Sequence, residues 1–179
     1  MISKEDIKHL EKIFPFWFNI SQNDKAKIIL SSRILSLKKN AIFFNSHDLD
    51  GLLFLKSGKL RFFLSHLEAR ELPLYYLNNM EVEFFENFTD NSISMILDIA
   101  FIVEKNSEIL LIPYSVLNLF RSKYSIMEKF LHNLTREKFS KSLLSLQNIL
   151  LKPLKERLLN FLYSLNKTEI SLTHEEGLL

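Results

Sequence analysis

The sequence predicts an α+β protein of 179 residues, in which a central region of short β-strands lies between two helical regions. Residues 39–113 contain short apolar runs separated by polar breaks, a pattern that is typical of an all-β sandwich or barrel. Residues 125–151 contain neither Gly nor Pro and carry one long apolar stripe, which predicts a single long helix. The region before residue 39 is charged and amphipathic, which predicts short helices.

Two helix starts are predicted within residues 1–38. Ser3 followed by Asp6 matches the capping-box pattern, in which each side chain bonds the other residue's backbone N–H. Ser21 matches a second N-cap, and the apolar residues that follow it extend to Ile34. We therefore expect two helices, with Ile34 on the apolar side of the second.

Glycine is rare in this chain, and two of its 3 glycines lie seven residues apart in the β region. Gly58 lies in a Lys-Ser-Gly-Lys sequence between two apolar runs, which predicts the turn of a β-hairpin. Gly58 can take positive φ without a Cβ clash, which suits such a turn. Gly51 is expected to form the bend by which the chain enters the β region.

The predicted helix over residues 125–151 would be about 40 Å long at 1.5 Å per residue. This exceeds what one face of a small β-domain can cover, so part of the stripe is expected to pack against the same helix of a second subunit. The alternative is a helix that folds back entirely on its own domain. Pro153 then fits the first turn of a further helix. The predicted dimer interface consists of the apolar residues of the stripe, Met127, Leu131, Leu134, Phe139, Leu143, Leu146 and Leu150.

The composition excludes several classes of function. The chain has no Cys, which excludes disulfides, thiolate zinc sites, Cys-ligated iron–sulfur clusters and cysteine nucleophiles. It has no signal-peptide pattern and no apolar run as long as a membrane span, so a cytoplasmic protein without membrane contact is expected. No His-x-His metal motif of the cupin type and no Gly-x-Ser-x-Gly motif occurs, so we expect no enzyme and no metal site.

Charge is unevenly distributed along the chain. Residues 121–179 hold ten Lys or Arg against six Asp or Glu, a net charge of +4, whereas residues 1–120 have a net charge of −2. A basic C-terminal part is compatible with nucleic-acid binding. An asymmetry of this size is more typical of a solvated helix face, which is the interpretation that we favour.

The order of these parts resembles the Crp/Fnr superfamily of bacterial transcription regulators. The resemblance covers essentially the whole chain, and it depends on the order of the motifs rather than on any single one. The segments that carry it are residues 38–65, 69–81, 101–120, 150–162 and 170–176.

The resemblance implies an antiparallel β-roll of the jelly-roll type, like a cyclic-nucleotide-binding domain, and a homodimer. It divides the chain into four parts. Residues 1–38 would form the N-terminal helices of the sensor domain, and residues 39–113 the β-roll effector domain. Residues 114–151 would form a long dimerisation helix, and residues 152–179 a linker helix with the start of a winged helix-turn-helix. Promoter DNA would be bound only by the helix-turn-helix domain. We therefore expect that this chain by itself does not recognise operator DNA, either as a truncated regulator or as a natural sensor module.

The chain departs from the family where cyclic-nucleotide binders hold the phosphate. Those members use Phe-Gly-Glu, a short helix, and then Arg-Ser/Thr-Ala, whose Arg pairs with the phosphate. Residues 81–100 contain no Gly and no Arg, so binding of cyclic AMP in the usual mode is not expected. Asn40, Ala69 and Met80 also stand where members commonly carry Gly. The region instead adds the carboxylates of Glu81, Glu83, Glu86 and Asp90.

The effector is left open by the sequence. One hypothesis is a small-molecule sensor whose pocket is lined by Phe85, Phe88, Ile93, Met95 and Leu131. A second is a ligand-independent interaction module, with the roll filled by Phe and Leu and with Glu81, Glu83 and Glu86 on a solvated strand face. A third is a haem-based sensor of NO or CO. Its candidate axial ligands are His9, His47, His66, His132, Met80, Met95 and Tyr76.

Overall fold

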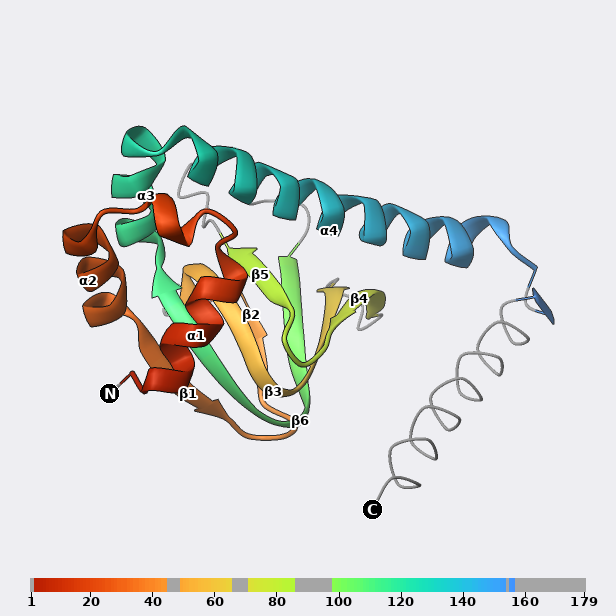
Figure 1. The fold of residues 1–179 in the computed structure, drawn as a ribbon. Helices are drawn as coiled ribbons and strands as arrows, with labels where there is room; N and C mark the ends of the chain where they lie inside the picture. Colours follow the sequence, from red (N-terminus) through yellow and green to blue (C-terminus); the bar gives the residue numbers. More distant parts are fainter. Residues whose placement is uncertain (1, 45–48, 66–70, 86–97, 154, 157–179) are drawn as a thin grey trace, which may run out of the picture.

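The computed structural model describes residues 2–44, 49–65, 71–85, 98–153 and 155–156, and it confirms the α+β class. A six-stranded antiparallel β-roll has helices at one end, and one long helix passes over it and continues beyond it (Figure 1). The helices are α1 (Lys4–Ile13), η1 (Trp17–Asn19), α2 (Gln22–Ser31), α3 (Tyr114–Lys123) and α4 (Ser125–Leu151). The strands are β1 (Arg33–Leu37), β2 (Ile42–Phe44), β3 (Gly51–Ser65), β4 (Leu72–Leu77), β5 (Val82–Phe85) and β6 (Asp98–Pro113).

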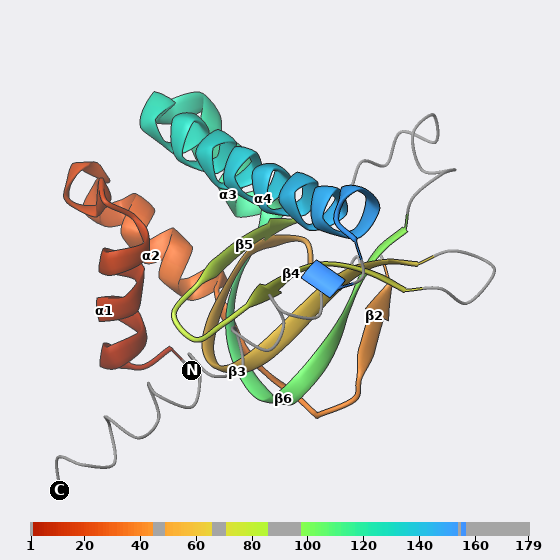
Figure 2. The same cartoon turned by 90° about the vertical axis from the view of Figure 1, so that its right-hand side faces the viewer.

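Strands β3 and β6 pair with each other over their whole length and organise the sheet. The first part of β3 pairs also with β5, and the matching part of β6 pairs with β1. The later part of β3 pairs with β4, and the matching part of β6 pairs with β2. The two long strands therefore belong to both halves of the sheet, which closes into a roll (Figure 2).

The predicted hairpin at Gly58 is wrong, because β3 continues through this residue. The pairing of β3 with β6 shifts register between Leu55 and Leu60, so that Gly58 lies at an irregularity inside the strand. Its φ is 107°, and a Cβ added there would lie 2.0 Å from Ser107 Oγ. Glycine is thus required by the close passage of β6. Gly51 starts β3 with a φ of 134°, and the bend expected at this residue stays a prediction.

The second N-terminal helix ends earlier than predicted. α2 ends at Ser31, and the Ser32 hydroxyl donates a 2.6 Å hydrogen bond back to the Ile28 carbonyl. Ile34 lies in β1, where it pairs with Leu110 of β6. The helical assignment was wrong because pairing with a distant apolar strand overrides the local helical pattern.

Both predicted helix starts are confirmed. In α1 the Asp6 N–H donates to Ser3 Oγ at 3.1 Å, and the Ser3 N–H donates to Asp6 Oδ2 at 2.8 Å, which completes the capping box. In α2 the Asp24 N–H donates to Ser21 Oγ at 3.3 Å. Substituting such a cap typically costs about 1 kcal/mol of stability.

Two apolar clusters form the core. One joins α1, η1 and α2 to α3, the start of α4 and the outer face of the sheet, and it includes Phe14, Trp17 and Met127. The other fills the inside of the roll and includes Leu53 and Phe62. Within the described part of the chain, no helix has both the length and the apolar character needed to span a membrane.

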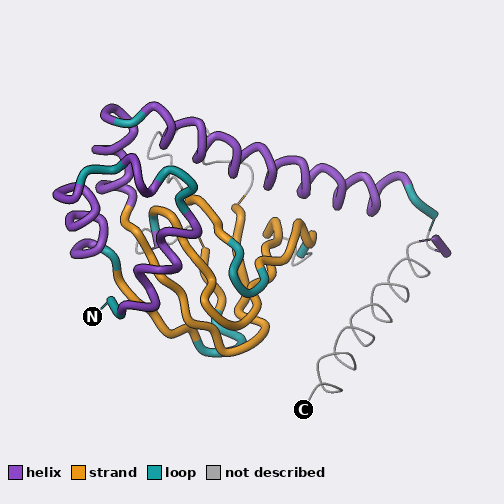
Figure 3. Tube along the Cα trace, viewed as in Figure 1, coloured by secondary structure: helices purple, strands orange, loops and turns teal. Residues whose placement is uncertain are grey.

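The helical region after the roll consists of two helices. Residues 114–151 break at Tyr124, between α3 and α4, and α4 spans Ser125–Leu151 as the sequence predicts. Figure 3 shows α4 as one uninterrupted helix that passes over the roll. A second helical segment is described only at residues 155–156, so most of the predicted helix after Pro153 lies outside the described residues.

Candidate functional site

Aromatic side chains fill the described interior of the β-roll. The Phe62 ring lies 4.8 Å from the Tyr75 ring, 5.7 Å from the Phe85 ring and 5.2 Å from the Phe101 ring, centroid to centroid. These four residues come from β3, β4, β5 and β6. Leu146 of α4 packs against the same cluster, so the long helix contributes to the roll's interior.

A buried carboxylate, Glu83 of β5, faces the long helix. Its exposed fraction is 4%, and that of Lys138, near the middle of α4, is 7%. Lys138 Nζ lies 3.4 Å from Glu83 Oε2, which makes a buried ion pair between the roll and α4. Glu83 is therefore not on a solvated strand face, as the ligand-independent hypothesis placed it.

The carboxylate of Glu83 has few hydrogen bonds of good geometry, although hydrogen bonding from Tyr75 and Lys138 acts to lower its pKa. Its Oε1 accepts one from the Phe84 N–H at 3.2 Å, whereas Oε2 accepts no well-formed hydrogen bond from the described residues. Burial raises the pKa of Glu83 to about 7, although the positive charge of Lys138 acts in the opposite direction. A neutral carboxyl group is thus accessible close to neutral pH at this site.

Tyr75 completes this cluster from β4. Lys138 Nζ lies 5.3 Å from the centroid of the Tyr75 ring, which is within the range of a cation–π contact. Burial, and then the neighbouring charge of Glu83, raise the pKa of the Tyr75 hydroxyl well above its usual value. We call Tyr75, Glu83 and Lys138 the helix–roll cluster.

Charges at the edge of the helix–roll cluster are more exposed. Lys141 of α4 forms an ion pair with Glu137 at 2.8 Å and approaches Glu81, the residue before β5, at 4.0 Å. The Ser145 hydroxyl donates a 2.7 Å hydrogen bond to the Pro73 carbonyl of β4. These polar contacts therefore join α4 to β4 and to the turn before β5.

The predicted pocket residues are only partly described. Phe85 packs in the roll cluster, whereas Leu131 of α4 belongs to the cluster beneath the N-terminal helices. The other three, Phe88, Ile93 and Met95, lie outside the described residues, as do Glu86 and Asp90.

The predicted dimer residues fall into two groups along α4. Met127 and Leu131 are buried in the protomer's own core, which leaves them unavailable to a second subunit. Leu134 and Leu146 are half-buried. The exposed members lie in the second half of the helix and are Phe139, Leu143 and Leu150, with exposed fractions of 62%, 50% and 75%.

The predicted haem ligands come from separate elements. His9 lies on α1, where its ring centroid is 5.2 Å from that of Phe54 and its Nδ1 is buried without a partner. Tyr76 lies on β4, Met80 on the turn before β5 and His132 on α4, whereas His47, His66 and Met95 lie outside the described residues. The described residues contain no group of three or more His, Asp or Glu that could hold a metal ion.

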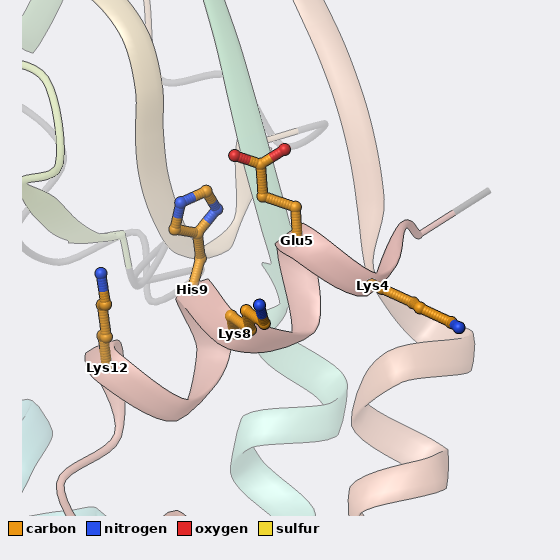
Figure 4. A pocket seen from close by; sticks show the side chains of 5 residues that line it. All are labelled: Lys4, Glu5, Lys8, His9 and Lys12. Atoms are coloured by element: carbon orange, nitrogen blue, oxygen red, sulfur yellow. The ribbon is translucent and has the colours of Figure 1, made fainter.

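Two open hollows lie away from the helix–roll cluster. One, of about 450 Å³, runs along α1, where Figure 4 shows its lining side chains, Lys4, Glu5, Lys8, His9 and Lys12. The other, of about 540 Å³, lies where β3 and β6 bend and is lined partly by Ser57, Asn106 and Ser107.

Comparisons with known proteins agree on the fold. A putative Crp/Fnr regulator from Eubacterium rectale has a TM-score of 0.74 and 25% identity, over 89% of this chain and 74% of that one. The chain has a Crp/Fnr-type fold. FixK2 from Bradyrhizobium japonicum has a TM-score of 0.62 and 13% identity, over 76% of this chain and 67% of that one. A mutant of CooA from Carboxydothermus hydrogenoformans has a TM-score of 0.53 and 14% identity, over 79% of this chain and 89% of that one. No protein-family model and no curated protein matches the sequence.

Two departures from the Crp/Fnr glycine pattern are visible in the backbone. Asn40 and Met80 have positive φ values of 68° and 67°, a conformation that is uncommon for residues with a side chain. The Met80 N–H donates to the Leu55 carbonyl at 2.7 Å, which holds the turn before β5 in place. The chain thus keeps glycine-like turns at these two positions without glycine. Ala69 lies outside the described residues.

Proposed function

We propose that this chain is the effector-sensing and dimerisation region of a bacterial Crp/Fnr-type transcription regulator, acting in the cytoplasm as a homodimer. The observation that carries the proposal is the division of α4 into two parts. Its first part is buried against the N-terminal helices and the roll, through Met127, Leu131 and Lys138. Its second part bears exposed apolar side chains, so one rigid helix would connect the roll to a partner subunit (Figure 1).

The spacing of these apolar residues supports a helix pair. Phe139, Leu143, Leu146 and Leu150 are separated by four, three and four residues, which is the a/d repeat of a coiled coil. Three of them are substantially exposed in the single chain. Two copies of this seam would bury them together, and Leu134 would flank the start of the interface.

Sedimentation equilibrium tests the dimer. The chain is expected to behave as a dimer at micromolar concentration, and Leu143→Glu is expected to give a monomer because it places a charge in the seam. Leu30→Glu is the matched control, since Leu30 of α2 is 84% exposed and lies outside α4. A wild-type monomer, or a Leu143→Glu dimer, would refute this part of the proposal.

The proposed effector is not cyclic AMP. Residues 81–100 contain no Gly and no Arg, so they offer no counterpart of the Arg that pairs with the phosphate in cyclic-nucleotide binders. Isothermal titration calorimetry with cyclic AMP up to millimolar concentration is expected to give no saturable heat. A saturable response would contradict this assignment.

A ligand-independent module is the second candidate, and one observation favours it. The described interior of the roll is occupied by the protein's own rings, Phe62, Tyr75, Phe85 and Phe101. A haem-based gas sensor is the third candidate. An absorption spectrum after haem reconstitution tests it, because a Soret band would indicate bound haem. Thermal-shift screening with small molecules distinguishes a small-molecule sensor from a ligand-independent module, because only the sensor is stabilised by binding.

Promoter recognition, in this proposal, requires a helix-turn-helix domain of the kind that the family resemblance places after the linker helix. The weak basic excess of residues 121–179 would supply at most nonspecific binding. A gel-shift assay at controlled salt is expected to show no sequence-specific complex with the 179-residue chain. Specific binding by this chain would overturn the assignment.

A further inference from the structure

We propose that Glu83 and Lys138 form a proton-sensitive contact that sets how firmly α4 rests on the β-roll. The docking itself is a property of the described structure. Its regulatory meaning rests on the proposed function, because α4 would also carry the dimer interface.

The ion pair of Glu83 and Lys138 lies where it can affect the position of the second half of α4. Glu83 is in β5, opposite Leu53 of β3, and Lys138 lies near the middle of the 27-residue α4. Before Lys138 the helix is anchored by buried apolar residues, and after it the helix carries the exposed seam. A change at this contact would therefore alter how the second half of α4 lies against β4 and β5.

The geometry satisfies an ionised Glu83 poorly. The 3.4 Å contact with Lys138 is longer than the roughly 2.7–2.9 Å of a charge-assisted hydrogen bond. Glu83 Oε2 accepts no well-formed hydrogen bond from the described residues. A carboxylate with so little solvation is costly when it is buried and is relieved when water reaches it.

The direction of the pH effect follows from this comparison. With α4 docked, the pKa of Glu83 is raised to about 7. With α4 lifted, water reaches the carboxyl group and its pKa returns towards the model-compound value. The docked state therefore binds the proton more tightly, so docking is strongest at low pH and weakens as pH rises through about 7.

Three further titratable groups near Glu83 have shifted pKa values and keep their state over this range. On β4, Tyr75 has a raised pKa and stays neutral. On α4, Lys141 has a raised pKa and Glu137 a lowered one, so both stay charged. Glu81 lies at the edge of β5, and β3 presents the apolar Leu53 to Glu83.

Hydrogen–deuterium exchange of α4 in the full chain tests the proposal. Protection of the segment around Lys138, corrected for the intrinsic pH dependence of exchange, is expected to fall about tenfold between pH 6 and pH 8. Glu83→Gln is expected to abolish this change. Glu81→Gln, at the partly exposed residue just before the same strand, is the matched control and is expected to retain it.

A corrected profile that is flat in the wild type, or a tenfold change that persists in Glu83→Gln, would overturn the proposal. If Glu83→Gln does not fold, the double variant Glu83→Leu with Lys138→Leu replaces both charges by apolar groups and is expected to dock α4 independently of pH. His132→Gln excludes a contribution from the histidine on α4. Sedimentation at both pH values reports dimerisation separately, so a monomeric chain would refute the proposed function without affecting this test.

Discussion

The hydroxyl of Tyr124 donates a 2.7 Å hydrogen bond to Asp24 Oδ2, across 100 residues of sequence. This bond joins the break between α3 and α4 to the first turn of α2. Lys123 forms an ion pair with the same carboxylate, and the Ser21 hydroxyl donates to it at 2.8 Å. The starting direction of α4 is therefore fixed by the N-terminal helices, upstream of its contact with the roll.

Removing the Tyr124 hydroxyl is expected to loosen the start of α4, because this hydroxyl also accepts a 3.1 Å hydrogen bond from the Ser21 N–H. Tyr124→Phe keeps the ring and deletes only the hydroxyl, so the melting temperature should fall by about 3 °C. Differential scanning calorimetry measures the change, and Tyr76→Phe on β4 is the control, because Tyr76 is 44% exposed. Equal melting temperatures for Tyr124→Phe and the wild type would show that the bond contributes nothing.

The same cluster predicts a loss of stability in acid. Hydrogen bonding from Lys123, then from Tyr124 and Ser21, holds the pKa of Asp24 well below its usual value. A carboxylate whose folded pKa is lowered stabilises the fold above its unfolded pKa, and this stability is lost as pH falls below about 4. Thermal melts from pH 6 to pH 3 should show a smaller decline for Asp24→Asn than for the wild type. A parallel decline would contradict this role of Asp24.

Gly58 is expected to tolerate no side chain. In Gly58→Ala the new Cβ would lie 2.0 Å from Ser107 Oγ at a φ of 107°, so either the bend in β3 or the path of β6 must shift. The free energy of unfolding should fall by about 2–4 kcal/mol, measured by urea denaturation. Ser57→Ala, one residue earlier, is the control and should lie within about 0.5 kcal/mol of the wild type. A similarly small effect for Gly58→Ala would show that the bend adapts.

Met80 is expected to be a site of backbone strain. Its φ of 67° is unfavourable for a residue with a Cβ, and its side chain is 47% exposed, so little burial is lost on replacement. Met80→Gly should therefore raise the free energy of unfolding by about 0.5–1 kcal/mol. Asn40→Gly should have a smaller effect, because Asn tolerates this conformation better. Destabilisation by Met80→Gly would mean that the side chain makes a contact worth more than the strain.

Apolar replacement of the buried ion pair is expected to stabilise the protein above neutral pH. The raised pKa of Glu83 means that its contribution to stability is greatest at low pH and is lost as pH rises from about 4.5 to about 7. Glu83→Leu with Lys138→Leu should therefore be more stable than the wild type at pH 8, by about 1–4 kcal/mol. Urea denaturation at pH 8 and pH 5.5 measures the difference, which should shrink at the lower pH. A double variant that is less stable at pH 8 would show that the pair stabilises the fold.

The features that the sequence predicted well are those encoded locally. The capping box of Ser3 with Asp6 and the uninterrupted stripe of α4 depend on residues only a few positions apart. The position of Gly58 inside a continuous strand could not be predicted in this way. Glycine is needed there because of Ser107, which lies far along the chain on β6. Ile34 was misassigned for the same reason, since its strand exists only through pairing with β6.

The helix–roll cluster could not be predicted from the sequence either. Glu83 and Lys138 are 55 residues apart, and each resembles an ordinary surface charge in its local context. The only local signal is that Glu83 alternates with Val82 and Phe84 in an apolar strand, which is compatible with either face. Glu83 is buried only because α4 packs against β5 in the folded chain.

Cysteine cross-linking shows whether two copies of α4 meet along the seam of Phe139, Leu143, Leu146 and Leu150. The chain has no native Cys, so single substitutions need no background changes. In a parallel pair, Leu143→Cys places two thiols across the seam at disulfide distance, whereas Asn148→Cys places them on the opposite side of the helix. Mild oxidation is expected to link Leu143→Cys into a covalent dimer and to leave Asn148→Cys monomeric. Equal cross-linking of both variants, or of neither, would show that the two helices do not meet along this seam.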